Sequence, residues 1–136
     1  MTGEEFIKQF ETGAIAIDSF HHADHVQLAF SYLEKYSVLT ALQRFSCALK
    51  KFAAAHGKIQ LYHETITCAY FFLIHERMAS SGNVSWAEFE SNNPDLFIWK
   101  DGILTRYYRD ATLKSDLARK VFVLPDKSLE DASICG

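Results

Sequence analysis

Histidines are concentrated at the start of one segment of the sequence, as His21, His22 and His25. His22 and His25 are three residues apart, so on a helix both side chains project from one face. Neutral imidazole is a common ligand of zinc and other transition metals, and it also forms directional hydrogen bonds. Asp24 lies between the two residues and can orient a ring. The spacing is typical of a metal or ligand site, but also of a helix start whose polar side chains cap backbone amides.

A second polar group, Tyr62 to Thr67, opens a strongly apolar segment with the sequence Tyr-His-Glu-Thr-Ile-Thr. On a helix, His63 and Thr67 share one face, and Glu64 lies on the neighbouring face. An unpaired carboxylate in an apolar interior is costly or takes up a proton, so Glu64 needs a metal, an arginine, a histidine or water beside it. His63 and Glu64 are therefore the candidate catalytic residues if the protein is an enzyme.

Arginines in the last third of the chain offer a cation for such a site. Arg106 and Arg109 flank two tyrosines, and Arg119 follows farther on. An inward-facing arginine can pair with Glu64 or hold a carboxylate or phosphate of a ligand. Cys68 lies on an apolar face and is interpreted as a core residue rather than a nucleophile. The predicted ligand-binding residues are His22, Asp24, His25, His63, Glu64, Thr67 and Arg119.

Helical periodicity predicts the elements that position these residues, because apolar side chains recur at spacings of three and four. The connector 14–20 is expected to be extended. We expect helices at 4–10, 23–36, 39–56, 59–78 and 86–91, a short turn from 93, and a last helix from Leu113 or Ser115 to Val121 or Phe122. Apolar residues cover nearly the whole circumference of the segment 59–78, which is typical of a helix in the middle of a bundle. The sequence therefore predicts an all-α, compact, single-domain helical bundle with a buried central helix.

Composition limits the classes of function. At 136 residues, and without a Gly/Ser or Pro-rich linker, the chain fits one domain over 1–136 with a polar, loose tail at about 126–136. The net charge of -3 argues against nucleic acid as a partner. No apolar stretch has the roughly 20 residues of a membrane span, so we expect no membrane partner. Three widely spaced cysteines and the lack of a secretion signal predict a cytoplasmic location.

The chain resembles a group of small bacterial proteins that share three sequence signatures and have no activity attached to them. The signatures are Phe-x-His-x-Asp-His from Phe20 to His25, Tyr-His-Glu-Thr-x-Thr from Tyr62 to Thr67, and a Tyr-Tyr pair followed by Ala-Arg-x-x-Phe-Val-x-Pro-Asp from Ala118 to Asp126. The resemblance implies a shared helical fold. It also implies a shared site that contains His22, Asp24, His25, His63 and Thr67. Lys114 departs from the third signature, where an aromatic or apolar residue is expected.

Two hypotheses for function follow. The first is a small-molecule-binding or interaction module with a buried His/Glu/Thr polar site, whose partner is a small polar molecule. The alternative is an enzyme that depends on a divalent metal held by His22, His25 and His63. Exposure of Trp86, Phe97 or Trp99 would additionally offer a homodimer face. The sequence leaves open whether the protein is an enzyme.

Overall fold

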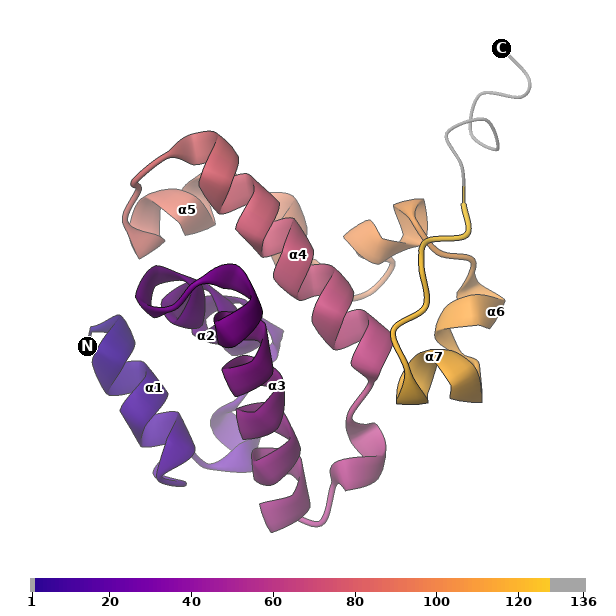
Figure 1. Cartoon of the computed structure of the whole chain (residues 1–136), viewed down its shortest axis with the longest axis horizontal. Coiled ribbons are helices and arrows are strands. Elements are labelled where there is room, and N and C mark those ends of the chain that lie inside the picture. Colours follow the sequence, from indigo (N-terminus) through magenta and orange to yellow (C-terminus); the bar gives the residue numbers. More distant parts are fainter. Residues whose placement is uncertain (1, 128–136) are drawn as a thin grey trace.

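Amphipathic segments of the chain form helices, and residues 2–127, which the computed structural model describes, contain no strand (Figure 1). This confirms the predicted all-α helical bundle. The α-helices are α1 (Gly3–Glu11), α2 (His22–Lys35), α3 (Val38–Ala55), α4 (Glu64–Ser81), α5 (Trp86–Asn92), α6 (Asp110–Leu113) and α7 (Asp116–Lys120). Short 3₁₀ helices connect them: η1 (Ile17–Ser19), η2 (Ile59–Leu61), η3 (Pro94–Phe97) and η4 (Ile103–Arg106).

Polar residues set the starts of several helices. Ser85 and Glu88 form a capping box at the start of α5, with each side chain bonded to the backbone of the other residue. At α2, the Asp24 carboxylate accepts a hydrogen bond from the His21 amide at 2.9 Å. Asp24 is therefore used to begin the helix that carries His22 and His25.

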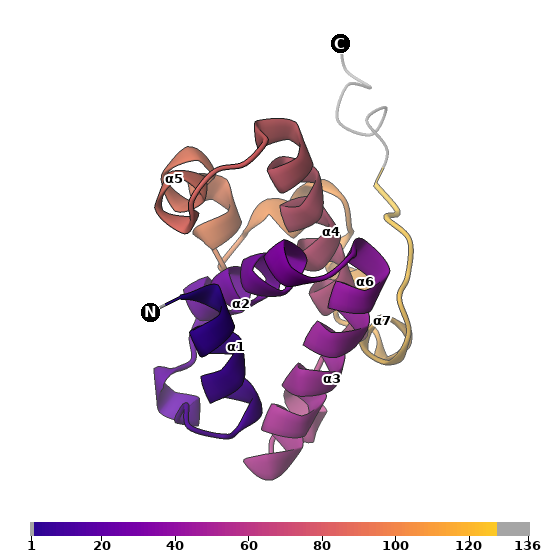
Figure 2. The same ribbon diagram turned by 60° about the vertical axis from the view of Figure 1, so that its left-hand side comes forward.

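α2 and α4 occupy the middle of the molecule. α2 contacts α1, α3, α4 and η3, and its residues from Leu28 to Tyr32 are all buried. In Figure 2, α1 and α3 lie on one side of α2, and α4 and α5 lie on its other side. α4 packs against α2 and α3 on one side and against η4 and α7 on the other. Both helices that carry the predicted site residues are thus held by contacts on several sides.

The segment after α7 is fastened to α4. The buried Thr65 hydroxyl donates to the Val121 carbonyl at 2.8 Å and accepts from the Val123 amide at 3.0 Å. The buried Tyr108 hydroxyl donates to the Val123 carbonyl at 2.7 Å. The two Thr65 bonds join α4 to residues more than fifty positions away, and the Tyr108 bond holds the same segment from fifteen positions away.

Three expectations need correction or completion. The connector 14–20 contains the 3₁₀ turn η1 instead of being extended throughout. The last helix starts after Ser115, whose hydroxyl caps the Ala118 amide, but a separate turn, α6, precedes it. Asp126 belongs to the expected loose tail, yet its carboxylate accepts hydrogen bonds from the Arg109 amide and the Thr112 hydroxyl. The rest of that tail, from residue 128, lies outside the described residues.

Candidate functional site

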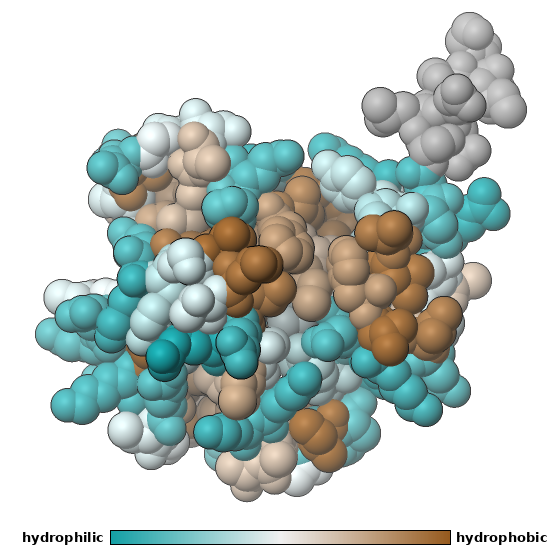
Figure 3. All heavy atoms as spheres, in the orientation of Figure 1, coloured by the Kyte–Doolittle hydropathy of each residue, from teal (hydrophilic) through white to brown (hydrophobic). Residues whose placement is uncertain are grey.

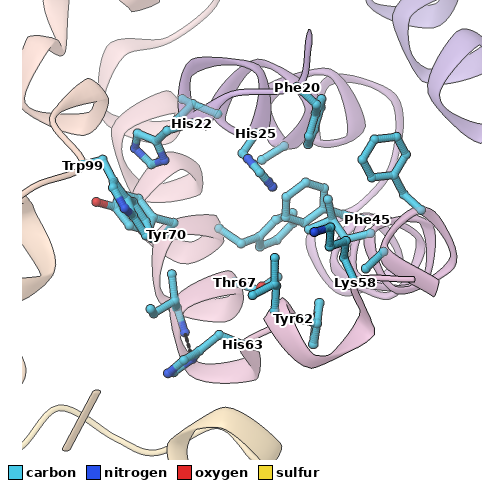
Figure 4. A pocket seen from close by; sticks show the side chains of 18 of the residues that line it. Phe20, His22, His25, Phe45, Lys58, Tyr62, His63, Thr67, Tyr70 and Trp99 are labelled. Atoms are coloured by element: carbon cyan, nitrogen blue, oxygen red, sulfur yellow. Dashed lines mark hydrogen bonds between the residues drawn. The ribbon is translucent and has the colours of Figure 1, made fainter. Parts of the chain in front are cut away.

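A cavity of about 510 Å³ lies between α2, α3 and α4. Its walls are mainly aromatic and aliphatic, and Figure 4 shows its polar side chains projecting from opposite sides. The aromatic wall consists of Phe20, Phe45, Phe52, Tyr62, Tyr70, Phe71 and Trp99. The other polar or charged side chains of the lining are His22, His25, Lys58, His63, Thr67 and Arg119. A volume of this size, lined by apolar groups with a few polar ones, is typical of a small-molecule site.

The cavity brings together most of the residues that the sequence singles out. His22, His25, His63, Thr67 and Arg119 all line it. Asp24 and Glu64 do not line it. Asp24 instead caps the start of α2, and Glu64, the first residue of α4, bonds to Tyr62.

His25 offers an unused hydrogen-bond acceptor to the cavity. Its Nδ1 lies 3.2 Å from the His21 carbonyl oxygen, and because a carbonyl only accepts, Nδ1 must carry the proton. Burial lowers the pKa of His25 from 6.5 to about 4, so the ring is neutral at pH 7 and Nε2 carries a lone pair. Figure 4 shows the ring reaching from α2 into the cavity, toward the side where Thr67 and Tyr62 lie.

His22 lies at the edge of the cavity, where a backbone carbonyl and two aromatic rings hold its side chain. Its Nε2 donates to the Leu96 carbonyl at 2.8 Å, and its ring lies against Tyr70 and Trp99, with centroids 4.9 and 5.1 Å away. Burial lowers the pKa of His22 as well. His22 therefore joins α2 to η3 and supports the aromatic wall.

Both ring nitrogens of His63 are engaged by the backbone. Nδ1 accepts from the Ile66 amide at 3.1 Å, which caps the start of α4, and Nε2 donates to the Leu113 carbonyl at 2.7 Å. Figure 4 shows His63 at the lower end of the cavity, directed away from His22 and His25. These two bonds give His63 a structural role at the junction of α4 and α6.

Glu64 bonds to a neutral tyrosine, which is not among the partners expected from the sequence, namely a metal, an arginine, a histidine or water. The Tyr62 hydroxyl donates to Glu64 Oε1 at 2.6 Å, and burial, followed by this bond, raises the pKa of Tyr62. Lys50 lies over the Tyr62 ring, 5.2 Å from its centroid. Arg119 is not paired with Glu64 and instead donates from Nη1 to the Gln60 carbonyl at 2.9 Å.

A metal centre receives no support from this arrangement. The described part of the chain holds no group of three His, Cys, Asp or Glu side chains placed to bind a metal ion. His22, His25 and His63 border one cavity, yet the only lone pair of the His63 ring is on Nδ1, which already accepts from the Ile66 amide, while Nε2 carries the proton donated to Leu113. The three imidazoles reach the same space without forming a common ligand set.

Sequence reasoning missed several lining residues. Lys58 follows Gly57, which ends α3 in a left-handed conformation at φ 66°, so the chain turns there and directs Lys58 to the cavity. Gly57 indicates the end of a helix in the sequence, but nothing in the sequence around Lys58 indicates that this lysine lines a site. Trp99, considered as a dimer contact, lines the cavity and is 58% exposed. Its stacking on Tyr70 depends on the course of a loop.

A second, smaller hollow of about 220 Å³ lies between α4, η4 and the segment after α7. Its lining includes Phe72, Leu104, Tyr107 and Phe122, and Glu76 is the one ionisable side chain besides the tyrosines that residues 2–127 contribute to it. Figure 3 shows hydrophobic side chains gathered on the right-hand side of the molecule, where α7 and the segment after it lie. The polar groups that can orient a ligand are in the larger cavity.

The chain was compared with protein-family models, with curated proteins and with solved structures, and none of them matches. Likeness to the group of bacterial proteins named above therefore stays a prediction. Among the described residues, every helix is too short or too polar to cross a membrane.

Proposed function

We propose that the protein binds a small, mainly apolar organic molecule in the cavity between α2, α3 and α4. The observation that carries the proposal is a space of about 510 Å³ walled by aromatic rings into which a neutral imidazole presents a lone pair. Burial of apolar ligand surface supplies the affinity, at about 25 cal/mol per Å² before the costs of association. His25 supplies orientation, by accepting a hydrogen bond from an O–H or N–H of the ligand.

The chemistry of the lining favours binding over turnover. With its pKa lowered to about 4, His25 is a weak base near neutral pH. His22 and His63 each spend an N–H on a backbone carbonyl. Glu64, the other candidate catalytic residue, is outside the cavity and bonded to Tyr62. The polar side chains thus fix the cavity and its ligand, which agrees with the first of the two sequence hypotheses.

A pair of matched variants tests the proposal. N-phenylnaphthylamine, an uncharged aromatic probe that fluoresces in apolar surroundings, should bind the wild-type protein. Ala53→Phe fills the cavity that Ala53 lines and should weaken probe binding by about tenfold or more. Ala54→Phe places the same ring on the neighbouring residue of α3, which is exposed and outside the lining, and should leave binding unchanged.

The circular dichroism spectrum and melting midpoint of each variant show whether it is folded. Failure of the probe to bind the folded wild-type protein would contradict the proposal. Equal loss of binding in the two variants would mean that the probe does not sit in this cavity.

A further inference from the structure

Positive charge gathers at one part of the cavity lining and is not offset there. Lys58 and Arg119 both line the cavity, and the described residues of the lining include no aspartate or glutamate. Both side chains belong to exposed residues, so their charged groups remain in contact with water at the opening. The lining as a whole is therefore apolar with a cationic rim.

The two cations come from different elements but meet the same short segment. Lys58 is the residue directly before η2. Arg119, in α7, reaches the same turn through its bond to the Gln60 carbonyl at 2.9 Å. That bond uses one N–H of a guanidinium that has five, so donors remain for a ligand. Neither residue forms an ion pair within the described part of the chain.

The two carboxylates closest in sequence to the histidines of the lining, Asp24 and Glu64, lie outside the lining and bond to other protein groups. The Glu64 carboxylate accepts from the Tyr62 hydroxyl, and the Asp24 carboxylate accepts from the His21 amide. On α2, neutral His25 presents a lone pair, which repels an anion and suits a hydrogen-bond donor. The cavity lining thus contains two cations, Lys58 and Arg119, and a neutral hydrogen-bond acceptor, His25.

From this pattern we infer that the ligand is an amphipathic organic anion. Its carboxylate, sulfonate or phosphate contacts Lys58 and Arg119 at the opening, and its apolar, aromatic-sized body fills the space beneath. A donor group on that body meets His25. The inference rests on the proposed function, because it specifies the chemical class of the ligand for the same cavity.

Displacement of N-phenylnaphthylamine by naphthoate and by its uncharged counterpart naphthamide tests the inference. Naphthoate should bind about five- to tenfold more tightly than naphthamide, the gain expected from two solvent-exposed charge contacts. The double variant Lys58→Gln/Arg119→Gln should lose this preference. The control Lys51→Gln/Lys120→Gln makes the same change in net charge at exposed residues outside the lining and should keep it.

A salt titration of the wild-type protein gives a second readout that needs no variant. Raising the ionic strength should weaken naphthoate binding and leave naphthamide binding unchanged, because salt screens only the charged contact. Equal affinities for the two competitors, or a preference that survives in the Lys58/Arg119 variant, would overturn the inference while leaving the cavity as a binding site. Absence of probe binding to the wild-type protein would instead remove the proposed function itself.

Discussion

The His25 ring at the mostly apolar cavity has lost most of its hydration and contacts protein groups instead. His25 packs its ring against Phe20, with centroids 4.3 Å apart, and bonds its Nδ1 to the backbone. Burial is the largest cause of its lowered pKa, the nearby His22 lowers it further, and Asp24 and the hydrogen bond to His21 oppose the shift. The histidine therefore stays uncharged down to a pH at which an exposed one is protonated.

This lowered pKa predicts a stability change with pH. Between 6.5 and about 4, the unfolded state binds a proton at His25 that the folded state does not, so the contribution is complete above 6.5 and is lost as the pH falls through this window. We expect His25→Phe to reduce the loss of unfolding free energy between neutral pH and about pH 4.5 by on the order of 2 kcal/mol. Urea denaturation of wild type and variant at both pH values measures the difference.

His75 provides the control, because it lies on α4 outside the lining of the cavity. His75→Phe should leave the pH dependence of stability close to that of the wild-type protein. A pH dependence of His25→Phe identical to that of the wild type would contradict the assignment of this window to His25.

At the residue scale, helical spacing was enough to indicate which side chains would reach the same space. The three-residue spacing of His22 and His25 was enough to bring both to the cavity, and the four-residue spacing did the same for His63 and Thr67. The partners of these side chains were not predictable, since the Leu96 and Leu113 carbonyls that bind His22 and His63 come from short turns far along the chain. A backbone carbonyl gives no residue-specific pattern, so its pairing with a distant side chain cannot be predicted from the sequence.

Among the elements, α4 depends on a segment that has no regular structure of its own. Thr65 serves as both donor and acceptor to the chain at Val121 and Val123. A single buried hydroxyl thereby satisfies two backbone groups that have no helix or sheet partner. Its loss leaves both groups unpaired against an apolar surface.

Thr65→Val, which keeps the shape but removes the hydroxyl, should therefore lower the unfolding free energy by about 2 to 4 kcal/mol. The Val123 amide should also exchange its hydrogen for deuterium much faster than in the wild-type protein. Thr40→Val, at an exposed position of α3, is the matched control and should change neither quantity appreciably. Unaltered protection of the Val123 amide in Thr65→Val would show that the bond does not hold this segment.

Long elements were predictable and short ones were not. α2, α3 and α4 each span several turns, so their apolar periodicity is visible over the noise of single residues. η1 and α6 span three and four residues, too few to show a period, and their formation depends on neighbours distant in sequence. Asp126 illustrates the limit, because a polar residue in an irregular segment gives no sign that Arg109 and Thr112 will bind it.

At the scale of the whole molecule, the helices enclose space instead of filling it. The hydrophobic pattern of the sequence predicts which helix faces point inward. The distance between the helices decides whether the inward side chains fill the space or leave a cavity. No pattern in the sequence predicted a cavity of about 510 Å³. Such a space leaves packing energy unused, and a ligand can recover it.

Ligand binding should therefore stabilise the entire fold. N-phenylnaphthylamine at about ten times its Kd should add about 1.4 kcal/mol, which corresponds to a rise in Tm of roughly 3 to 6 °C at this chain length. Calorimetry, which is independent of probe fluorescence, measures the shift. Ala53→Phe should show no rise at the same probe concentration, whereas an equal rise in that variant would place the stabilising interaction elsewhere.

The two tryptophans of the chain stand in contrasting surroundings. Trp86 is partly buried against Phe30, Phe89 and Phe97, whereas Trp99 is 58% exposed, lines the cavity and stacks on Tyr70. An occupant of the cavity would shield one indole from water and leave the other as it was. The intrinsic ultraviolet emission of the unmodified protein thus contains both a reporter of occupancy and an internal reference.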